Sequence, residues 1–194
     1  MGSMTRHVVF LLCSFVMLAS ASANSLELQA ILDKTTISAP SRVAFREVRY
    51  NRLLKDPLIF SGYLEYLQDG SLRKVIEVPF HEAYLVSGDT IQIERDGEVQ
   101  TLSLKKSRSL RTMLGGIEAI LAGETAQIER VFHSELSGAE NDWTLLLRPR
   151  SSRIAKQLNA LTVVGNEESI MSIRFDLQDG EWHEMEIRAS QPSP

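Results

Sequence analysis

Residues 60–97 read FSGYLEYLQDGSLRKVIEVPFHEAYLVSGDTIQIERDG, and this stretch decides the fold class. Its β-prone runs alternate apolar with polar residues and are broken by the turn pairs Asp69-Gly70, Gly88-Asp89 and Asp96-Gly97. Alternation with a period of two is typical of half-buried strands, and Asp-Gly pairs between such runs favour hairpins. The stretch therefore predicts a string of antiparallel hairpins.

The same pattern continues on both sides of this stretch. The predicted strands are 43–50, 60–67, 71–78, 83–86, 90–95, 98–104, 126–135, 143–148, 158–164, 169–177 and 182–189. Sequential hairpins at this spacing favour a single antiparallel sheet, curled or closed. We therefore expect a mainly β protein with helices (α+β), built on one curved antiparallel sheet of about eleven strands.

Helical periodicity marks two main segments. Residues 25–33 place Leu28, Ile31 and Leu32 at helical spacing behind a possible Ser25 cap, which predicts a short amphipathic helix. Residues 109–123 form the clearest internal helix, whose apolar face consists of Leu110, Met113, Leu114, Ile117, Ile120 and Leu121. The pair Gly115-Gly116 costs about 1 kcal/mol per Gly relative to Ala, so we expect this helix to kink or break there. A further short helix is predicted at 152–156.

The N-terminus has the order of a secretory signal. Arg6 and His7 precede a nearly wholly apolar run at 8–18, and small residues follow at 19–23. A run of about 11 residues is too short to span a bilayer as a helix. We expect cleavage after Ala21 or Ala23, which makes 1–23 a signal peptide. The remaining divisions are one domain at 24–190 and a disordered tail at 191–194.

The residue inventory limits the classes of function. The single cysteine, Cys13, lies in the signal and follows Leu11-Leu12 rather than a small residue, so we expect neither a lipid anchor nor a disulfide. The chain holds 21 basic and 25 acidic side chains without a basic stripe, which argues against nucleic-acid binding. His81, His133 and His183 lie in no metal-ligand spacing, and no nucleophile elbow or phosphate-binding glycine loop follows a strand. We expect no cofactor, no metal and no enzymatic activity.

Apolar residues recur on one face of strand after strand, and this pattern has two interpretations. The residues form a packed core, or they line a cavity, because one curved sheet has no second sheet to cover its concave face. A curled sheet covered by helices makes such a pocket. The residues alone leave both interpretations open.

From Phe45 onward the order of elements resembles the LolA family, the periplasmic carriers that take lipoproteins from the inner to the outer membrane of Gram-negative bacteria. The residues that carry the resemblance are Phe45-Arg46-Glu47, the run 62–66, Val78-Pro79, the run 83–90, Met113-Leu114 where the family has a lid helix, 143–149, 173–180 and 184–187. The resemblance spans nearly all the mature chain and implies an incomplete β-barrel, capped by a helical lid, over a hydrophobic cavity that accepts acyl chains.

The resemblance also implies which residues form the site. The expected cavity lining is Phe45, Phe60, Leu64, Tyr66, Leu72, Ile76, Ile91, Ile93, Leu102 and Leu104. The expected lid residues are Leu110, Met113, Leu114, Ile117 and Leu121. A single bulge in a strand would reverse the facing of the residues after it.

The sequence departs from the family at two places. Family members hold an Arg-Pro at the end of the second strand, whose arginine latches the lid, whereas this chain reads Leu67-Gln68-Asp69-Gly70. The latch is absent or weakly replaced by Gln68, so we expect a lid that opens more easily or is held elsewhere. The basic residues Lys105, Lys106 and Arg108 are more similar to the LolA-related proteins of aryl-polyene and other lipid-pigment pathways.

These observations lead to one expected function and one alternative. We expect a monomeric periplasmic carrier that binds the acyl chains of lipoproteins or other lipids. Its partners would be an inner-membrane transporter and an outer-membrane acceptor, and its membrane contact would be transient. The alternative is a periplasmic sensing or regulatory module with the same fold, which binds a lipid or a protein partner.

Overall fold

The structure is a computed structural model that describes residues 20–36, 38–167 and 169–188. The basic start and apolar run of the predicted signal, and the predicted tail at 191–194, lie outside these residues. The predicted cleavage after Ala21 or Ala23 falls within the first turn of the first helix. None of the helices in the described ranges is long and apolar enough to cross a membrane.

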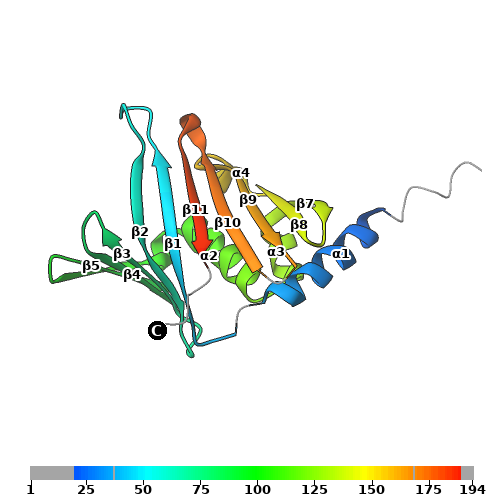
Figure 1. The fold of residues 1–194 in the computed structure, drawn as a ribbon, viewed down its shortest axis with the longest axis horizontal. Coiled ribbons are helices and arrows are strands. Elements are labelled where there is room, and N and C mark those ends of the chain that lie inside the picture. Colours follow the sequence, from blue (N-terminus) through cyan, green and yellow to red (C-terminus); the bar gives the residue numbers. More distant parts are fainter. Residues whose placement is uncertain (1–19, 37, 168, 189–194) are drawn as a thin grey trace, which may run out of the picture.

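A single antiparallel sheet of 11 strands forms the body of the protein (Figure 1), which confirms the predicted fold class. Its strands are β1 (Ser41–Tyr50), β2 (Leu58–Tyr66), β3 (Leu72–Val78), β4 (Glu82–Ser87), β5 (Thr90–Arg95), β6 (Glu98–Ser103), β7 (Phe132–Ala139), β8 (Asp142–Pro149), β9 (Leu158–Asn166), β10 (Ser169–Leu177) and β11 (Trp182–Arg188).

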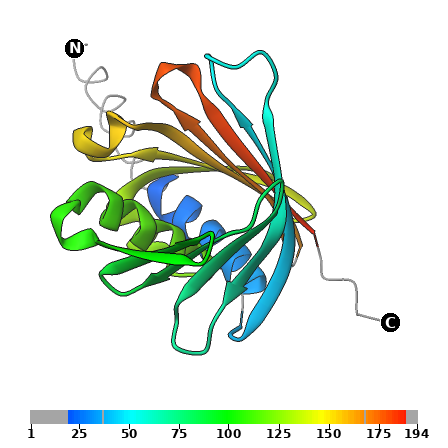
Figure 2. The same cartoon turned by 90° about the vertical axis from the view of Figure 1, so that its left-hand side faces the viewer.

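The strand order is β6-β5-β4-β3-β2-β1-β11-β10-β9-β8-β7, so the sheet is a meander apart from the pairing of β1 with β11. The two end strands, β6 and β7, follow each other along the chain, and the helical segment between them connects the two edges. Figure 2 shows the sheet curving around the helices without closing. The molecule is therefore an incomplete barrel with its helices on the concave side.

The helices are α1 (Ser20–Thr35), α2 (Arg108–Leu121), α3 (Thr125–Val131) and α4 (Ser152–Ala155), and short 3-10 turns occur at η2 (Leu104–Lys106) and η3 (Gln178–Gly180). The strand predicted at 126–135 is wrong in its first half, where α3 lies. Ile128 and Val131, three residues apart, are both buried there. A short apolar run fits either a helix or a strand, and here packing selects the helix.

The expected kink or break at Gly115-Gly116 does not occur, because α2 runs through both glycines. A Cβ at Gly116 would lie 2.5 Å from Cε2 of Phe132, so this glycine allows the helix to approach the start of β7 closely. The helix ends at Leu121, with Ala122 as its C-cap, and Gly123 follows in a left-handed conformation with φ of 72°. Such a glycine is a common helix terminator.

Two separate apolar clusters form the core. The larger lies where α1 to α4 cover β7 to β10, and its members include Leu28, Ile120, Phe132 and Trp143. The smaller consists of Phe45, Phe60, Ile76 and Met185, from β1, β2, β3 and β11. The helices thus fill the concave side of one half of the sheet and leave the other half, β1 to β6, less covered.

Candidate functional site

The strand register shows which residues share the concave face of β1 to β6. Leu64 pairs with Lys74, Lys74 with Tyr84, and Tyr84 with Ile93, while Tyr66, Leu72, Val86, Ile91 and Leu102 form the next row. Phe45 pairs with Gly62, and Gly62 with Ile76. Directly paired residues point to the same side of a sheet. All predicted lining residues in strands therefore lie on one face.

Burial divides the predicted lining residues into three groups. Phe45, Phe60, Ile76 and Leu104 are at most 4% exposed and act as core. Leu64, Tyr66, Leu72, Ile91 and Ile93 are half-buried. Leu102, on the edge strand β6, is 41% exposed. The half-buried group is an apolar surface that the protein's own helices do not fully cover.

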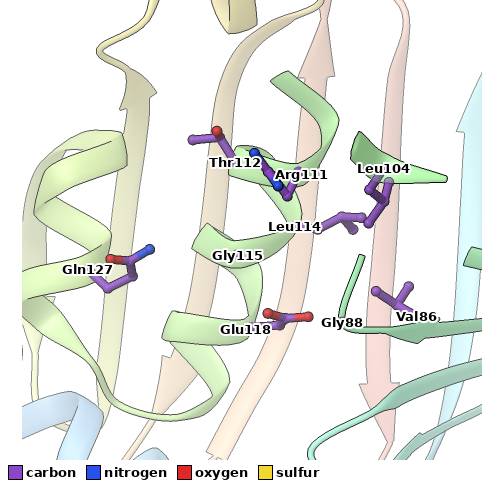
Figure 3. Close-up of a pocket in the computed structure, with 9 residues that line it drawn as sticks. All are labelled: Val86, Gly88, Leu104, Arg111, Thr112, Leu114, Gly115, Glu118 and Gln127. Atoms are coloured by element: carbon purple, nitrogen blue, oxygen red, sulfur yellow. The ribbon is translucent and has the colours of Figure 1, made fainter. Parts of the chain in front are cut away.

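A pocket of about 290 Å³ lies between α2 and the β4–β5 end of the sheet. It is lined by Val86, Gly88, Leu104, Arg111, Thr112, Leu114, Gly115, Glu118 and Gln127. Figure 3 shows Leu114 pointing from α2 toward Leu104 and Glu118 pointing toward Val86. The pocket volume is near the lower end of the roughly 300–1,000 Å³ that is usual for ligand sites. Burial raises the pKa of the Glu118 carboxyl.

The predicted lid residues do not act as one set. Met113, Ile117 and Leu121 pack against the larger core cluster. Leu114 lines the pocket, and Leu110 is half-buried. The helix thus uses one side to dock on the β7–β10 half and another to face the β4–β5 end.

An ion pair joins α2 to the first half of the sheet. Nη1 of Arg111 donates a hydrogen bond of 3.2 Å to Oδ1 of Asp89, in the turn between β4 and β5. Gln68, where the family's latching arginine is missing, lies exposed in the turn between β2 and β3. The ion pair between Arg111 and Asp89 thus joins α2 to the sheet at a different place from Gln68.

A cluster of charged side chains lies on the same concave face, centred on Glu47. Nε and Nη2 of Arg49 donate to the two Glu47 oxygens at 2.9 and 3.1 Å, and Nζ of Lys74 reaches Oε2 at 2.5 Å. Nδ1 of His183 lies 4.0 Å from Oε1. The Glu47 side chain is only 5% exposed, against 26% for Arg49 and 22% for Lys74.

The electrostatics of the cluster follow from this geometry. Burial alone would raise the pKa of Glu47, but Arg49 and Lys74 outweigh it and hold that pKa below its ordinary value. Burial lowers the pKa of Lys74, and Glu47 offsets only part of this effect. Burial, with the nearby charge of Arg49, also lowers the pKa of His183. The cluster around Glu47 therefore combines an ionised carboxylate, two cationic groups and an imidazole that resists protonation.

A second ion pair lies beside this cluster. Arg95 donates to Glu82, whose side chain is 3% exposed. Tyr84 lies against the same carboxylate, and burial together with Glu82 raises the pKa of its hydroxyl.

The sequence interpretation missed this cluster, although a signal was present. Glu47 and Arg49 follow Phe45 at spacings of two and four, and Lys74 lies two residues before Ile76, so alternation places all three on the inward face. Polar residues at inward positions mark a site or a specific pairing. In the described part of the chain, no group of three or more His, Cys, Asp or Glu side chains is arranged to hold a metal ion.

Comparison with known proteins gives one family match. Residues 20–187 match the family model described as outer membrane lipoprotein carrier protein LolA-like. Among curated protein sequences, none matches this chain.

Several solved structures resemble this chain at low identity. A LolA superfamily protein from Nitrosomonas europaea is 12% identical, with 88% of this chain and 95% of that chain covered and a TM-score of 0.46. The lipoprotein LppX from Mycobacterium tuberculosis is 14% identical, with 90% and 99% covered and a TM-score of 0.49. A chain of the MucA/MucB complex from Pseudomonas aeruginosa is 12% identical, with 90% and 59% covered and a TM-score of 0.35. The family assignment rests on the family model.

Proposed function

This chain belongs to the family of LolA-like outer membrane lipoprotein carrier proteins, and from that premise we propose that it carries a long apolar ligand on the concave face of its sheet. The ligand is an acyl chain of a lipoprotein or of another lipid. The predicted signal peptide supports a periplasmic location, where such a carrier would receive its ligand from an inner-membrane transporter and deliver it to an outer-membrane acceptor. The protein acts as a binding protein and not as an enzyme.

The observation that carries this proposal is the uneven covering of the concave face. Helices bury the β7–β10 half, whereas the half-buried group of Leu64, Tyr66, Leu72, Ile91 and Ile93 stays partly open to solvent. An apolar surface on the inside of a curved sheet is a typical site for an apolar ligand.

The hydrophobic effect is large enough for capture. Burying one CH₂ contributes about 0.8 kcal/mol, so a chain of about twelve carbons gives roughly 10 kcal/mol before ordering costs. This is sufficient for binding in the micromolar range or tighter. Release then requires a partner or a protein segment that competes for the same surface, and α2 is the segment next to it.

Native mass spectrometry of the protein purified from its own envelope, followed by extraction and identification of bound lipid, tests the proposal. We expect a bound lipid or, for emptied protein, binding of a fluorescent fatty acid. Protein that carries no lipid and ignores fluorescent fatty acids would contradict the proposal.

The variant Leu114→Asp tests the role of α2. A carboxylate in the pocket should weaken binding of the fatty-acid probe while the sheet stays folded. Leu53→Asp is the matched control, because Leu53 is 88% exposed in the loop between β1 and β2. Equal affinity of Leu114→Asp and the control for the fatty-acid probe would show that α2 is not part of the binding site.

A further inference from the structure

The charges around Glu47 do not balance. One carboxylate pairs with two cationic side chains, Arg49 and Lys74, on the concave face. His183 adds no negative charge, and its lowered pKa keeps it neutral at about pH 7. The Glu47 cluster therefore has one cationic side chain in surplus.

Two neighbouring carboxylates, Glu181 and Glu82, leave this surplus in place. Glu181 acts on His183, whose pKa it raises less than burial and Arg49 lower it, and in the described residues no ion pair joins Glu181 to Arg49 or Lys74. Glu82 is held by Arg95 and lies beside Tyr84. Glu98, which pairs with Arg95 in the register, is exposed on the edge strand β6. The rings of Phe45 and Phe60 lie 4.9 Å from Nζ of Lys74 and 4.3 Å from Cζ of Arg49. Aromatic faces stabilise a cation, but they carry no countercharge.

Both cations keep donors for a further partner. Lys74 uses one of its three ammonium hydrogens on Glu47, and within the described ranges Nη1 of Arg49 makes no hydrogen bond. The two side chains are partly exposed, 26% for Arg49 and 22% for Lys74. Because an uncompensated charge on a partly buried face is unfavourable, an anion at this point would stabilise the cluster.

We propose that Arg49 and Lys74 bind the anionic head group, a carboxylate or a phosphate, of an amphiphile whose tail lies on the half-buried apolar surface. This inference rests on the proposed carrier function and adds a head-group selectivity to it. Leu64 and Ile93 share the register row of Lys74, so apolar surface begins directly beside the cation.

The tail can follow β4 toward α2. Glu82, Tyr84 and Val86 point to the concave side in sequence, and Val86 lines the pocket under α2. Four residues of strand span about 13 Å. Tyr84, which pairs with Lys74, and Val86, which lines the α2 pocket, are thus successive inward residues of β4 that lead from the cations to the pocket.

The test uses the mature, delipidated protein and four probes with the same sixteen-carbon tail: the fatty acid, the alkyl phosphate, the alcohol and the trimethylammonium salt. Displacement of a neutral fluorescent apolar probe reports the affinity of each. We expect at least one of the two anionic probes to bind about tenfold or more tightly than the alcohol, and the ammonium salt to bind more weakly. The two anions together show whether a carboxylate or a phosphate is preferred.

Arg49→Gln should abolish this preference, and it leaves Glu47 paired with Lys74, so the fold is retained. Arg174→Gln is the matched control. Arg174 donates its Nε at 2.9 Å to Asp176, two residues away, and stacks 4.3 Å from the ring of Trp182, as Arg49 does with Glu47 and Phe60. Arg174 belongs to the row of Glu184 and Val48 on the opposite face of the sheet.

The outcomes are distinguishable. If no probe binds, both the proposed carrier function and this inference are overturned. If the anions and the alcohol bind equally well, the carrier function stands and the head-group inference is overturned. Loss of the preference in Arg174→Gln as much as in Arg49→Gln would also overturn it. Inorganic phosphate alone could also displace the fluorescent probe in the wild type and not in Arg49→Gln. That result would assign the site to a small anion and overturn the inference that it binds an amphiphile.

Discussion

Gly116 of α2 lies so close to Phe132 that a Cβ atom at position 116 would stand 2.5 Å from Cε2 of the ring. Its neighbour Gly115 has open space around the corresponding position. The two adjacent glycines therefore have different roles. Gly116 allows close packing of α2 on the body, and Gly115 leaves space at the pocket.

This difference predicts opposite effects of the same substitution. Gly116→Ala should destabilise the fold by about 1–3 kcal/mol, because the methyl group overpacks against a buried ring. Gly115→Ala should stabilise by up to about 1 kcal/mol through helix propensity. Urea unfolding of the two variants beside the wild type measures both effects. Equal destabilisation in both variants would show that the Phe132 contact is not the cause.

The ion pair between Arg111 and Asp89 predicts a weak and specific latch. Its side chains are 45% and 39% exposed, so a double-mutant cycle with Arg111→Ala and Asp89→Ala should give a coupling of about 0.2–1 kcal/mol. Release of a bound fatty-acid probe should be faster in each single variant, because α2 loses a contact with the sheet. Stopped-flow release rates measure this effect.

The charge reversal Arg111→Asp with Asp89→Arg is the control for this latch. It should restore slow release, since the pair is re-formed with opposite polarity. Release that stays fast in the reversed pair, or that is unchanged in the single variants, would show that α2 is held by other contacts.

Most of the fold could be predicted because its signals are local. Alternation and turn pairs give the order of the strands, and they indicate which residues of a strand share a face. Alternation fails in the short run that became α3, since Ile128 and Val131 lie three residues apart, a spacing that fits a helix and not a strand. It also says nothing of Gly116, whose role depends on a ring from another element. Contact of the predicted lining residues with a ligand stays a prediction.

The charged cluster shows why the contacts within the site could not be predicted, although alternation places its members on the inward face. Glu47 and Lys74 are 27 residues apart, and they meet only because β2 lies between β1 and β3. Gly62 stands at this crossing, where a Cβ would meet the carbonyl oxygen of Val75 at 1.9 Å. Such a meeting depends on register and on a bulge in the β2–β3 pairing, which no local pattern specifies.

The lowered pKa of Glu47 predicts a stability change in acid. Because the folded-state pKa lies below the ordinary 4.5, the carboxylate contributes stability that is complete above about pH 4.5 and is lost as the pH falls through the lowered value. His183 adds its own loss, since its pKa is lowered from 6.5 and protonation below that pH favours the unfolded chain. To remove the contribution of His183, the stability of Glu47→Gln and of its parent is therefore measured in a His183→Gln background.

In that background, Glu47→Gln should destabilise by about 3 kcal/mol at about pH 7, because Arg49 and Lys74 lose their countercharge on a buried face. The difference between the two proteins should shrink as the pH falls below about 4.5, where the carboxylate of the parent becomes protonated. Urea unfolding between about pH 7 and pH 3 measures it. Glu135→Gln is the control, because this residue pairs with Arg148 at 68% exposure and should change stability little at any pH. A difference between parent and Glu47→Gln that stays constant across this range would mean that the carboxylate is not the stabilising group.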